Sequence, residues 1–170
     1  RDIAAKLKRT ITIPTVSLPK NKLETKNFIE RNVGENVACA RFVALYVEGI
    51  KVIPSPLWLR KRIEASGLRS VNVIVDITNY VLLEQGQPIH AYDSRFVKGN
   101  QIQVLQDQKE NVLTTLDSQK VKLVQDDLVI YDQEKPIGLA GIMGGENSEV
   151  KDETTSIVIE VAHFSPVQIR

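Results

Sequence analysis

The sequence predicts an α+β fold, with a helical front half and a β-rich back half made of antiparallel hairpins. Two observations support this prediction. Up to residue 88, apart from one alternating run, apolar residues recur at helical spacing between helix start and stop signals. From residue 101 onward, turn residues separate short alternating runs. With 170 residues, 42% hydrophobic and 25% charged, the chain has a globular composition and can bury a core.

One strand and one helix are clearly marked in the front half. Residues 41–48 alternate between apolar and other positions, which predicts a strand. Ser55-Pro56 then opens a helix, because serine caps helices and proline fits the first helical position. Gly67 followed by Leu68 is expected to end this helix, with the glycine in the left-handed conformation.

The stretch from Val71 to Leu83 fits two patterns. Its apolar residues alternate as far as Ile77, as in a strand, but several of them also follow helical spacing. Ser70 as a cap and Gly86 as a stop favour a helix.

The back half is predicted to contain five short strands separated by turn residues rich in Asp, Asn and Gly. These strands are residues 101–106, 112–116, 121–123, 128–131 and 156–161.

Charge and cysteine content narrow the class of protein. The formal net charge of +1 weighs against a protein that grips a long stretch of nucleic acid, although it permits contact with the end of one strand. Cys39 is the only cysteine, so we expect a reducing compartment. No run approaches the roughly 18 apolar residues of a membrane span, and no signal-peptide pattern is present. We therefore expect a protein of a reducing compartment with no membrane partner.

Both ends of the sequence predict neighbouring segments, with two frayed termini as the alternative. Residues 2–9 resemble the tail of a helix, and a new helix opens at Ser165 shortly before the sequence ends. Residues 1–40 are polar and are predicted to be a connector from a preceding domain, with one short strand near Phe28. Residues 41–170 are predicted to be the functional domain, truncated at its C-terminus.

Three ionisable residues are candidates for chemistry. His90 follows a predicted helix end, where loops deliver side chains to clefts, and His163 lies between a strand and a helix cap. Glu160 interrupts an apolar strand, on the same face as Val158. A structural role for each histidine and a solvent-facing Glu160 are the simpler interpretations. The alternative is a Glu160 carboxylate that points into an apolar pocket and needs a donor there.

The glycine-rich run from Gly138 to Gly145 could bring backbone N–H groups close to a ligand, or could simply pack tightly in a sheet. It lacks the residues of a phosphate loop and the spacing of a dinucleotide site. A metal site formed by His90, Asp93 and Glu160 has no zinc-type spacing to support it, so we expect no metal. A Ser-His-Asp triad has no nucleophile-elbow motif.

Five sequence blocks occur together, and their combination is far more specific than any single block. They cover the chain from about residue 41 to its end and resemble the B3/B4 region of the β subunit of bacterial phenylalanine–tRNA ligases. The blocks are Ser55-Pro-Leu-Trp-Leu59, Val75-Asp-Ile-Thr-Asn-Tyr-Val-Leu-Leu-Glu84, Gly86-Gln-Pro-Ile-His-Ala-Tyr-Asp93, Ala140-Gly-Ile-Met-Gly-Gly145 and Ile159-Glu-Val-Ala162.

The resemblance implies a B3/B4-like fold and an editing domain that hydrolyses the ester of misacylated Tyr-tRNA(Phe). The family's site residues fall on three catalytic positions, His90, Asn79 and Thr78, and on three substrate-binding positions, Glu160, Gly141 and Gly144. Which group activates water stays open. The family pocket also uses a Thr-Asp-Ala stretch beyond the helix that opens at Ser165, and this sequence ends before it.

The resemblance also implies partners. These are the acceptor end of tRNA(Phe), tyrosine as the edited amino acid, and an α subunit in a cytoplasmic (αβ)2 assembly. ATP and Mg²⁺ serve the whole ligase in protein biosynthesis, and no cofactor is implied for this region. Two alternatives stay open: a module that binds the acceptor end or an amino acid without cleaving, and a structural spacer. A spacer predicts no polar group in an apolar cleft.

Overall fold

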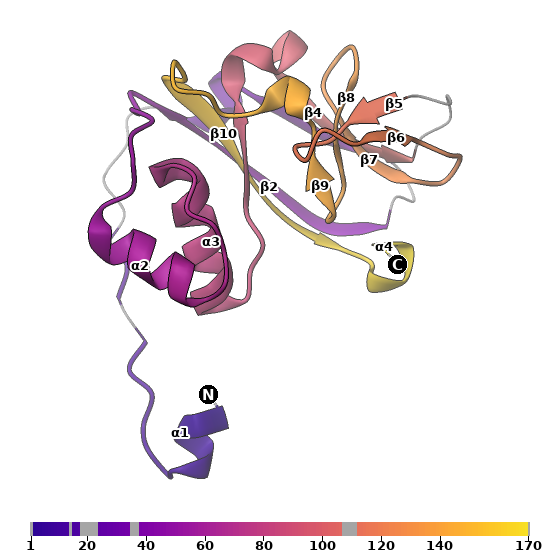
Figure 1. Cartoon of the computed structure of the whole chain (residues 1–170). Coiled ribbons are helices and arrows are strands. Elements are labelled where there is room, and N and C mark those ends of the chain that lie inside the picture. The colour runs from indigo at the N-terminus through magenta and orange to yellow at the C-terminus, as the bar shows by residue number, and fades with distance from the viewer. Residues whose placement is uncertain (1, 14, 18–23, 35–37, 107–111, 170) are drawn as a thin grey trace.

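The structure is a computed structural model that describes residues 2–13, 15–17, 24–34, 38–106 and 112–169. Two β layers face each other, and two helices cover the outer face of one layer (Figure 1). A short helix, α1 (Asp2–Lys6), stands apart from this body and buries no residue. The α+β prediction is confirmed. Within the described residues, no helix combines the length and the apolar composition needed to cross a bilayer.

The first layer is a three-stranded antiparallel sheet in the order β2-β10-β3. Its strands are β2 (Cys39–Glu48), β10 (Ser156–Phe164) and β3 (His90–Asp93). The strands predicted over residues 41–48 and 156–161 are confirmed, each slightly longer than expected. The expectation that His90 lies in a loop is wrong, because β3 begins at this residue and pairs with β10.

The second layer is a five-stranded sheet in the order β1-β4-β7-β8-β9. Its strands are β1 (Glu30–Val33), β4 (Gln101–Gln106), β7 (Leu128–Tyr131), β8 (Pro136–Leu139) and β9 (Met143–Gly144). A separate hairpin of β5 (Val112–Thr114) and β6 (Lys120–Lys122) packs on its outer face. The predicted strands over residues 101–106, 112–116, 121–123 and 128–131 are confirmed within two residues at their ends, whereas β8 and β9, from the glycine-rich run, were missed.

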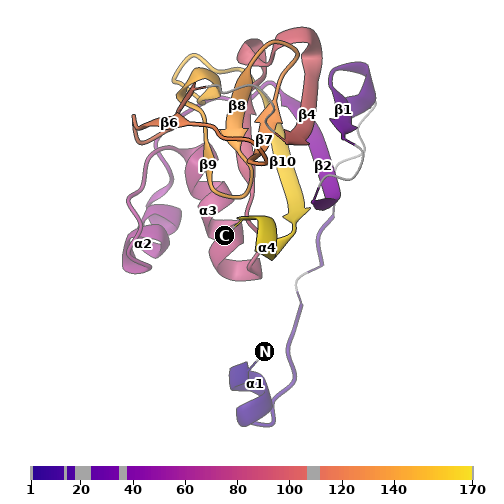
Figure 2. The same ribbon diagram turned by 90° about the vertical axis from the view of Figure 1, so that its right-hand side faces the viewer.

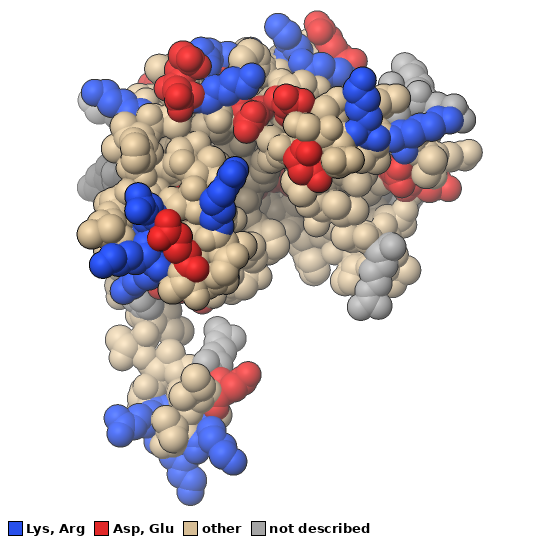
Figure 3. Space-filling view, in the orientation of Figure 1, with Lys and Arg blue, Asp and Glu red and all other residues tan. Residues whose placement is uncertain are grey.

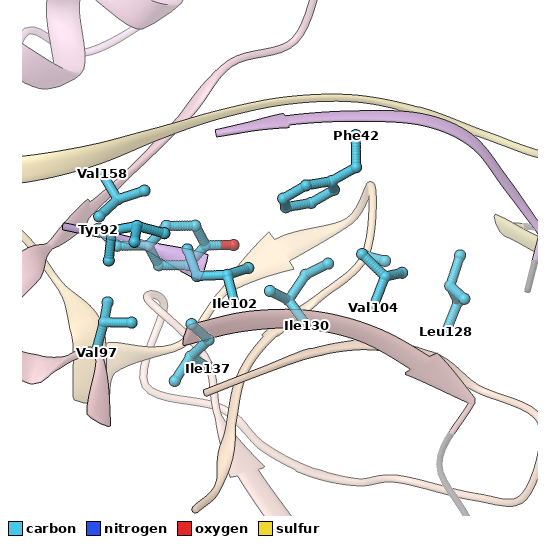
Figure 4. Packing of buried hydrophobic residues seen from close by; sticks show 11 residues of the cluster. Phe42, Tyr92, Val97, Ile102, Val104, Leu128, Ile130, Ile137 and Val158 are labelled. Carbon is cyan, nitrogen blue, oxygen red and sulfur yellow. The ribbon is translucent and has the colours of Figure 1, made fainter. Parts of the chain in front are cut away.

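The main core lies between the two layers (Figure 4). Phe42, Tyr92 and Val158 point inward from the first layer, toward Ile102 and Ile130 of the second, and all five are at most 3% exposed. Side chains alternate along β10, so its other face packs against the helical layer. Glu160 shares a face with Val158, as the alternation predicted, and therefore points toward the second layer.

The helical layer consists of α2 (Leu57–Ala65) and α3 (Val73–Gln85). The predicted helix in the ambiguous stretch is confirmed, but its cap is Asn72 and not Ser70: the Asn72 side chain accepts hydrogen bonds from the backbone of the first helical turn. Both predicted glycine stops are confirmed, since Gly67 and Gly86 have φ of 84° and 75°. The Ser70 hydroxyl instead donates to the Asp76 carboxylate at 2.5 Å.

Part of the segment expected to be a connector belongs to the folded body. β1 runs parallel to β4, and Ile29, immediately before β1, is 4% exposed in the main core. At the other end, the helix predicted after Ser165 is confirmed as α4 (Pro166–Ile169), which turns back from β10 toward the β8–β9 loop (Figure 2).

Candidate functional site

One pocket lies between β3, the C-terminal half of β10 and the β8–β9 hairpin. Its volume is about 190 Å³, comparable to an engineered cavity of about 150 Å³ that binds benzene. It therefore has room for one aromatic ring. Its lining is mostly apolar: Pro88, Ile89, His90, Tyr92, Ile130, Gly138, Leu139, Ala140, Gly141, Ile142, Met143, Gly144, Glu160, Ala162 and Phe164.

Glu160 is the carboxylate in this pocket and is only 7% exposed. Burial disfavours its charged form and raises its pKa from 4.5 to about 7, although a hydrogen bond from Tyr92 opposes the rise. Its Oε2 accepts this bond, and Oε1 has no partner among the described residues. The interpretation of Glu160 as a solvent-facing residue is wrong, because the second β layer covers its face of β10.

His90 lies opposite Glu160 in the β3–β10 pairing. Its Nε2 is buried and is the only buried side-chain nitrogen or oxygen of the described residues without a hydrogen-bond partner. Burial lowers the pKa of the imidazole from 6.5 to about 4, so the ring is neutral at pH 7. A buried polar atom without a partner costs free energy unless a ligand or water supplies one. Nε2 lies against Gly144 on β9, so a ligand or water that reached this side of the ring would give it the partner it lacks.

Tyr92 is a site residue that sequence reasoning missed. It is 1% exposed, its ring meets the His90 imidazole edge to face at a centroid distance of 4.5 Å, and its hydroxyl donates to Glu160. Burial raises its pKa, as does the neighbouring Glu160 charge. The signal in the sequence was its position: Tyr92 lies two residues after His90, so in a strand both side chains share a face.

The glycines of the β8–β9 hairpin form the opposite wall, so in this run tight packing in a sheet and lining a pocket occur together. Gly141, at φ 70°, makes the turn. A Cβ on Gly144 would overlap the imidazole of His90, so only glycine lets β9 approach the histidine this closely. Gly141, Gly144, His90 and Glu160, all singled out from the sequence, therefore lie at one pocket.

The remaining candidates lie elsewhere. Thr78 and Asn79 are on α3, which packs through Ile74 on the outer face of the first layer, and neither lines the pocket. Thr78 donates its hydroxyl to the carbonyl of Val75 at 2.8 Å. Their assigned roles therefore stay predictions. His163 is exposed, near the end of β10, and does not line the pocket.

Asp93 does not join His90 and Glu160 in a metal site. Alternation along β3 places it on the other face, where it binds Arg95 and accepts a hydrogen bond from Thr154 at 2.6 Å. No group of three or more potential His, Cys, Asp or Glu metal ligands forms among the described residues.

The basic face of α2 is largely engaged with its own neighbours. Arg60 pairs with Glu64, and Arg62 donates to the hydroxyl of Tyr80 at 2.6 Å and stacks against the Trp58 ring. Lys and Arg gather over this helix on the surface, and the surface is hollowed between the helical layer and the lobe that carries β9 and α4 (Figure 3).

The sequence-family model of the B3/4 domain matches residues 38–170. The chain belongs to the B3/4 domain family. The phenylalanine–tRNA ligase β subunits of Geobacter metallireducens and Protochlamydia amoebophila are 44% and 42% identical over the whole chain. The chain spans 21% of the length of each. It therefore corresponds to about one fifth of these curated relatives.

A solved structure shares the fold of this chain. It is the crystal structure of an N-terminal fragment of the phenylalanyl-tRNA synthetase β subunit from Pyrococcus horikoshii, with a TM-score of 0.62. The match covers 89% of this chain and 47% of the other, at 16% sequence identity. At that identity the match supports the fold alone.

The chemistry that this B3/4 domain can perform depends on the Glu160 carboxylate and the His90 imidazole in its pocket. An apolar pocket with a carboxylate in its lining can accept an aromatic ring that carries a hydrogen-bond donor. The neutral His90 ring lines the same pocket, with its partnerless Nε2 against Gly144. In the part of the chain that the structure describes, the pocket has no serine, threonine or cysteine to act as a nucleophile.

Proposed function

We propose that this B3/4 domain is the editing module of a phenylalanine–tRNA ligase and hydrolyses the ester of misacylated Tyr-tRNA(Phe). The observation that supports the proposal most directly is the buried Glu160 carboxylate beside the partnerless Nε2 of His90, inside an apolar pocket of ring size. A structural spacer would gain nothing from burying these two groups without full hydrogen bonding, because each costs free energy there.

The pocket suits the discrimination that editing needs. Tyrosine and phenylalanine differ by one hydroxyl, and an apolar synthetic site rejects an isostere with an added hydroxyl by only about a hundredfold. A site that hydrogen-bonds the hydroxyl can discriminate by roughly 10⁴ or more, because the smaller ligand leaves polar groups unpaired. Oε1 of Glu160 is the acceptor available for a tyrosine hydroxyl. The backbone N–H of Gly141 can donate to the phenol oxygen, because its neighbours Ala140 and Ile142 already donate to backbone carbonyls.

The reaction needs few groups. Water attacks the ester carbonyl carbon, the bond to the ribose oxygen breaks, and tyrosine and tRNA with a free hydroxyl leave. An aminoacyl ester is already activated, so positioning the water and the substrate contributes most of the rate enhancement required. His90, with its low pKa, is a weak base and acts by positioning the tRNA end or the water. Thr78 and Asn79 are proposed to orient the amino group or the water.

The proposed partners are those that the resemblance to phenylalanine–tRNA ligase β subunits implies. The acceptor end of tRNA(Phe) brings the ester to the pocket, and an α subunit completes the ligase as an (αβ)2 assembly in the cytoplasm. ATP and Mg²⁺ belong to aminoacylation by that assembly and not to hydrolysis at this pocket.

The test is deacylation of preformed Tyr-tRNA by the full-length ligase that carries this domain. Glu160→Ala should slow hydrolysis roughly ten- to hundredfold, the loss expected for a hydrogen bond to a charged group. His90→Ala should let Tyr-tRNA accumulate while Phe-tRNA synthesis continues. Glu48→Ala, an exposed carboxylate at the end of β2, is the matched control and should change neither activity.

Two outcomes would point elsewhere. Equal loss of hydrolysis and aminoacylation in the His90 variant would indicate misfolding. Wild-type ligase that binds Tyr-tRNA at this domain but leaves it intact would favour the alternative of a non-catalytic module that holds the acceptor end or the amino acid.

A further inference from the structure

The Glu160 carboxylate already accepts a hydrogen bond from a phenol of its own chain, that of Tyr92. The Tyr92 hydroxyl donates to Oε2 of Glu160, from the neighbouring strand β3 and from a position that is 1% exposed. The bond is diagonal across the strand pair, since the direct partner of Glu160 on β3 is His90 and that of Tyr92 on β10 is Val158. It therefore joins two strands as well as two side chains.

We propose that Tyr92 is the positioning residue for Glu160: its hydroxyl binds one carboxylate oxygen and so directs the other, Oε1, toward the pocket to accept the substrate's phenol. This inference rests on the proposed editing function and adds a specificity-determining residue to it. Tyr92 is not a catalytic residue, because it acts through Glu160.

The packing around Tyr92 supports this role. Its ring is fixed in the main core beside Val158 and Ile102 (Figure 4), so the hydroxyl has little freedom to leave the carboxylate. Gly138 on β8 lies over the hydroxyl, since a Cβ there would be 3.4 Å from the phenol oxygen. A glutamate side chain has several rotamers, and a bond to a fixed donor holds it in one of them.

The Tyr92 hydroxyl also affects the ionisation of the Glu160 carboxyl group. Three ionisable side chains face Glu160: His90 and Tyr92 from β3, and Cys39 from β2, whose pKa is raised by burial and further by the Glu160 charge. The lining residues from β8, β9 and their loop include no ionisable side chain, and α4 contributes none. His90 is neutral at pH 7. Tyr92 is therefore the one group here whose contact favours the ionised carboxylate, the stronger acceptor.

The test is Tyr92→Phe in the full-length ligase, which removes one oxygen atom and keeps the ring. We expect Tyr-tRNA hydrolysis at pH 7 to fall roughly tenfold, the lower range for loss of a hydrogen bond to a charged group. The rise of activity with pH should shift to higher pH by roughly one unit. The loss should appear mainly in KM, and aminoacylation should stay unchanged. Tyr46→Phe removes a phenol oxygen on β2 that has no hydrogen-bond partner among the described residues, and is the control.

The outcomes separate the two proposals. Unchanged hydrolysis and an unchanged pH profile would overturn the role of Tyr92, and faster hydrolysis would show that Tyr92 competes with the substrate. If the wild-type ligase leaves Tyr-tRNA intact, the editing proposal fails instead. Carbon-13 NMR of the Glu160 carboxyl in the 170-residue chain then tests the positioning directly: the Glu160 pKa should be higher in Tyr92→Phe than in the wild type, and equal values would overturn it.

Discussion

Glu160 and His90 lie directly opposite each other on β10 and β3, and burial shifts their pKa values in opposite directions. Burial raises the pKa of the carboxyl from 4.5 to about 7 and lowers that of the imidazole from 6.5 to about 4. Between about pH 4 and about pH 7, the His90 imidazole and the Glu160 carboxyl are therefore both neutral in the folded protein. The pocket is therefore uncharged in mildly acidic solution and gains one negative charge near pH 7.

The opposite shifts predict compensating effects on stability. The contribution of Glu160 is fully present below pH 4.5 and is lost as the pH rises to about 7, because only the unfolded chain ionises readily in that window. The contribution of His90 is fully present above pH 6.5 and is lost as the pH falls to about 4, because the unfolded chain takes up the proton. Each group changes the unfolding free energy by on the order of 3 kcal/mol across its pH window. The two changes have opposite signs, so the unfolding free energy of the wild type depends little on pH through this pair.

Single variants should expose each contribution in urea unfolding at several pH values. Relative to the wild type, Glu160→Gln should gain unfolding free energy as the pH rises from 4.5 to 7, and His90→Gln should lose it from 4 to 6.5. Parallel curves for the wild type and both variants would contradict the shifted pKa values.

Gly144→Ala should impair Tyr-tRNA hydrolysis much more than Gly138→Ala. A methyl group on Gly144 would overlap the His90 ring, whereas one on Gly138 would sit 3.4 Å from the Tyr92 oxygen, an ordinary contact. We expect at least a tenfold difference between the two variants, since a displacement of about 1 Å can cost a hundredfold in rate. Single-turnover deacylation measures it, and equal rates would show that His90 need not lie against β9.

Asp76 should be among the most important polar residues for stability. It is fully buried on α3 and accepts hydrogen bonds from Ser55, Ser70 and the backbone of Val71, at 2.5, 2.5 and 3.0 Å. Asp76→Ala should lower the unfolding free energy by about 3 kcal/mol, because it removes the buried acceptor shared by three hydrogen bonds, and a bond to a charged group is worth more than a neutral one. Asp76→Asn keeps one acceptor oxygen and should cost less. Urea unfolding measures both, and the reverse order would contradict this account.

Ile29→Ala tests whether the segment before β2 belongs to the folded body. Ile29 is 4% exposed, and a buried isoleucine truncated to alanine costs about 2–5 kcal/mol. Ile13→Ala is the control, because Ile13 is 72% exposed and its truncation should change the unfolding free energy little. An equally small change for Ile29 would return residues 24–34 to the connector.

Local sequence patterns predicted most of the fold and part of the site. Helix stops at Gly67 and Gly86 depend on neighbouring residues alone, and so does the alternation that assigned Glu160 its face of β10. Whether that face is buried depends on the second β layer, which the pattern does not contain. Ser70 was mistaken for a cap because its hydroxyl bonds to Asp76, six residues later, while Asn72 caps the helix.

Long-range pairing explains the largest omission. β3 has four residues, with His90 and Asp93 at its ends, and looks like a loop because its strand partner is β10, more than sixty positions later. Without that strand, Tyr92 and Glu160 could not be recognised as neighbours. The pocket is therefore built by long-range contacts between β3 and β10, which local sequence patterns do not predict.

β10 is the central strand of its sheet but the last strand in the chain. Its pairing of Glu160 with Ala44 joins residues 116 positions apart, and contacts this distant in sequence form late and slowly. During synthesis on the ribosome, β2 and β3 emerge before β10, the strand that lies between them in the sheet. The pocket therefore cannot form until the residues of β10 have left the exit tunnel, so every nascent chain passes through a stage in which β2, α2, α3 and β3 have been synthesised and the pocket is absent.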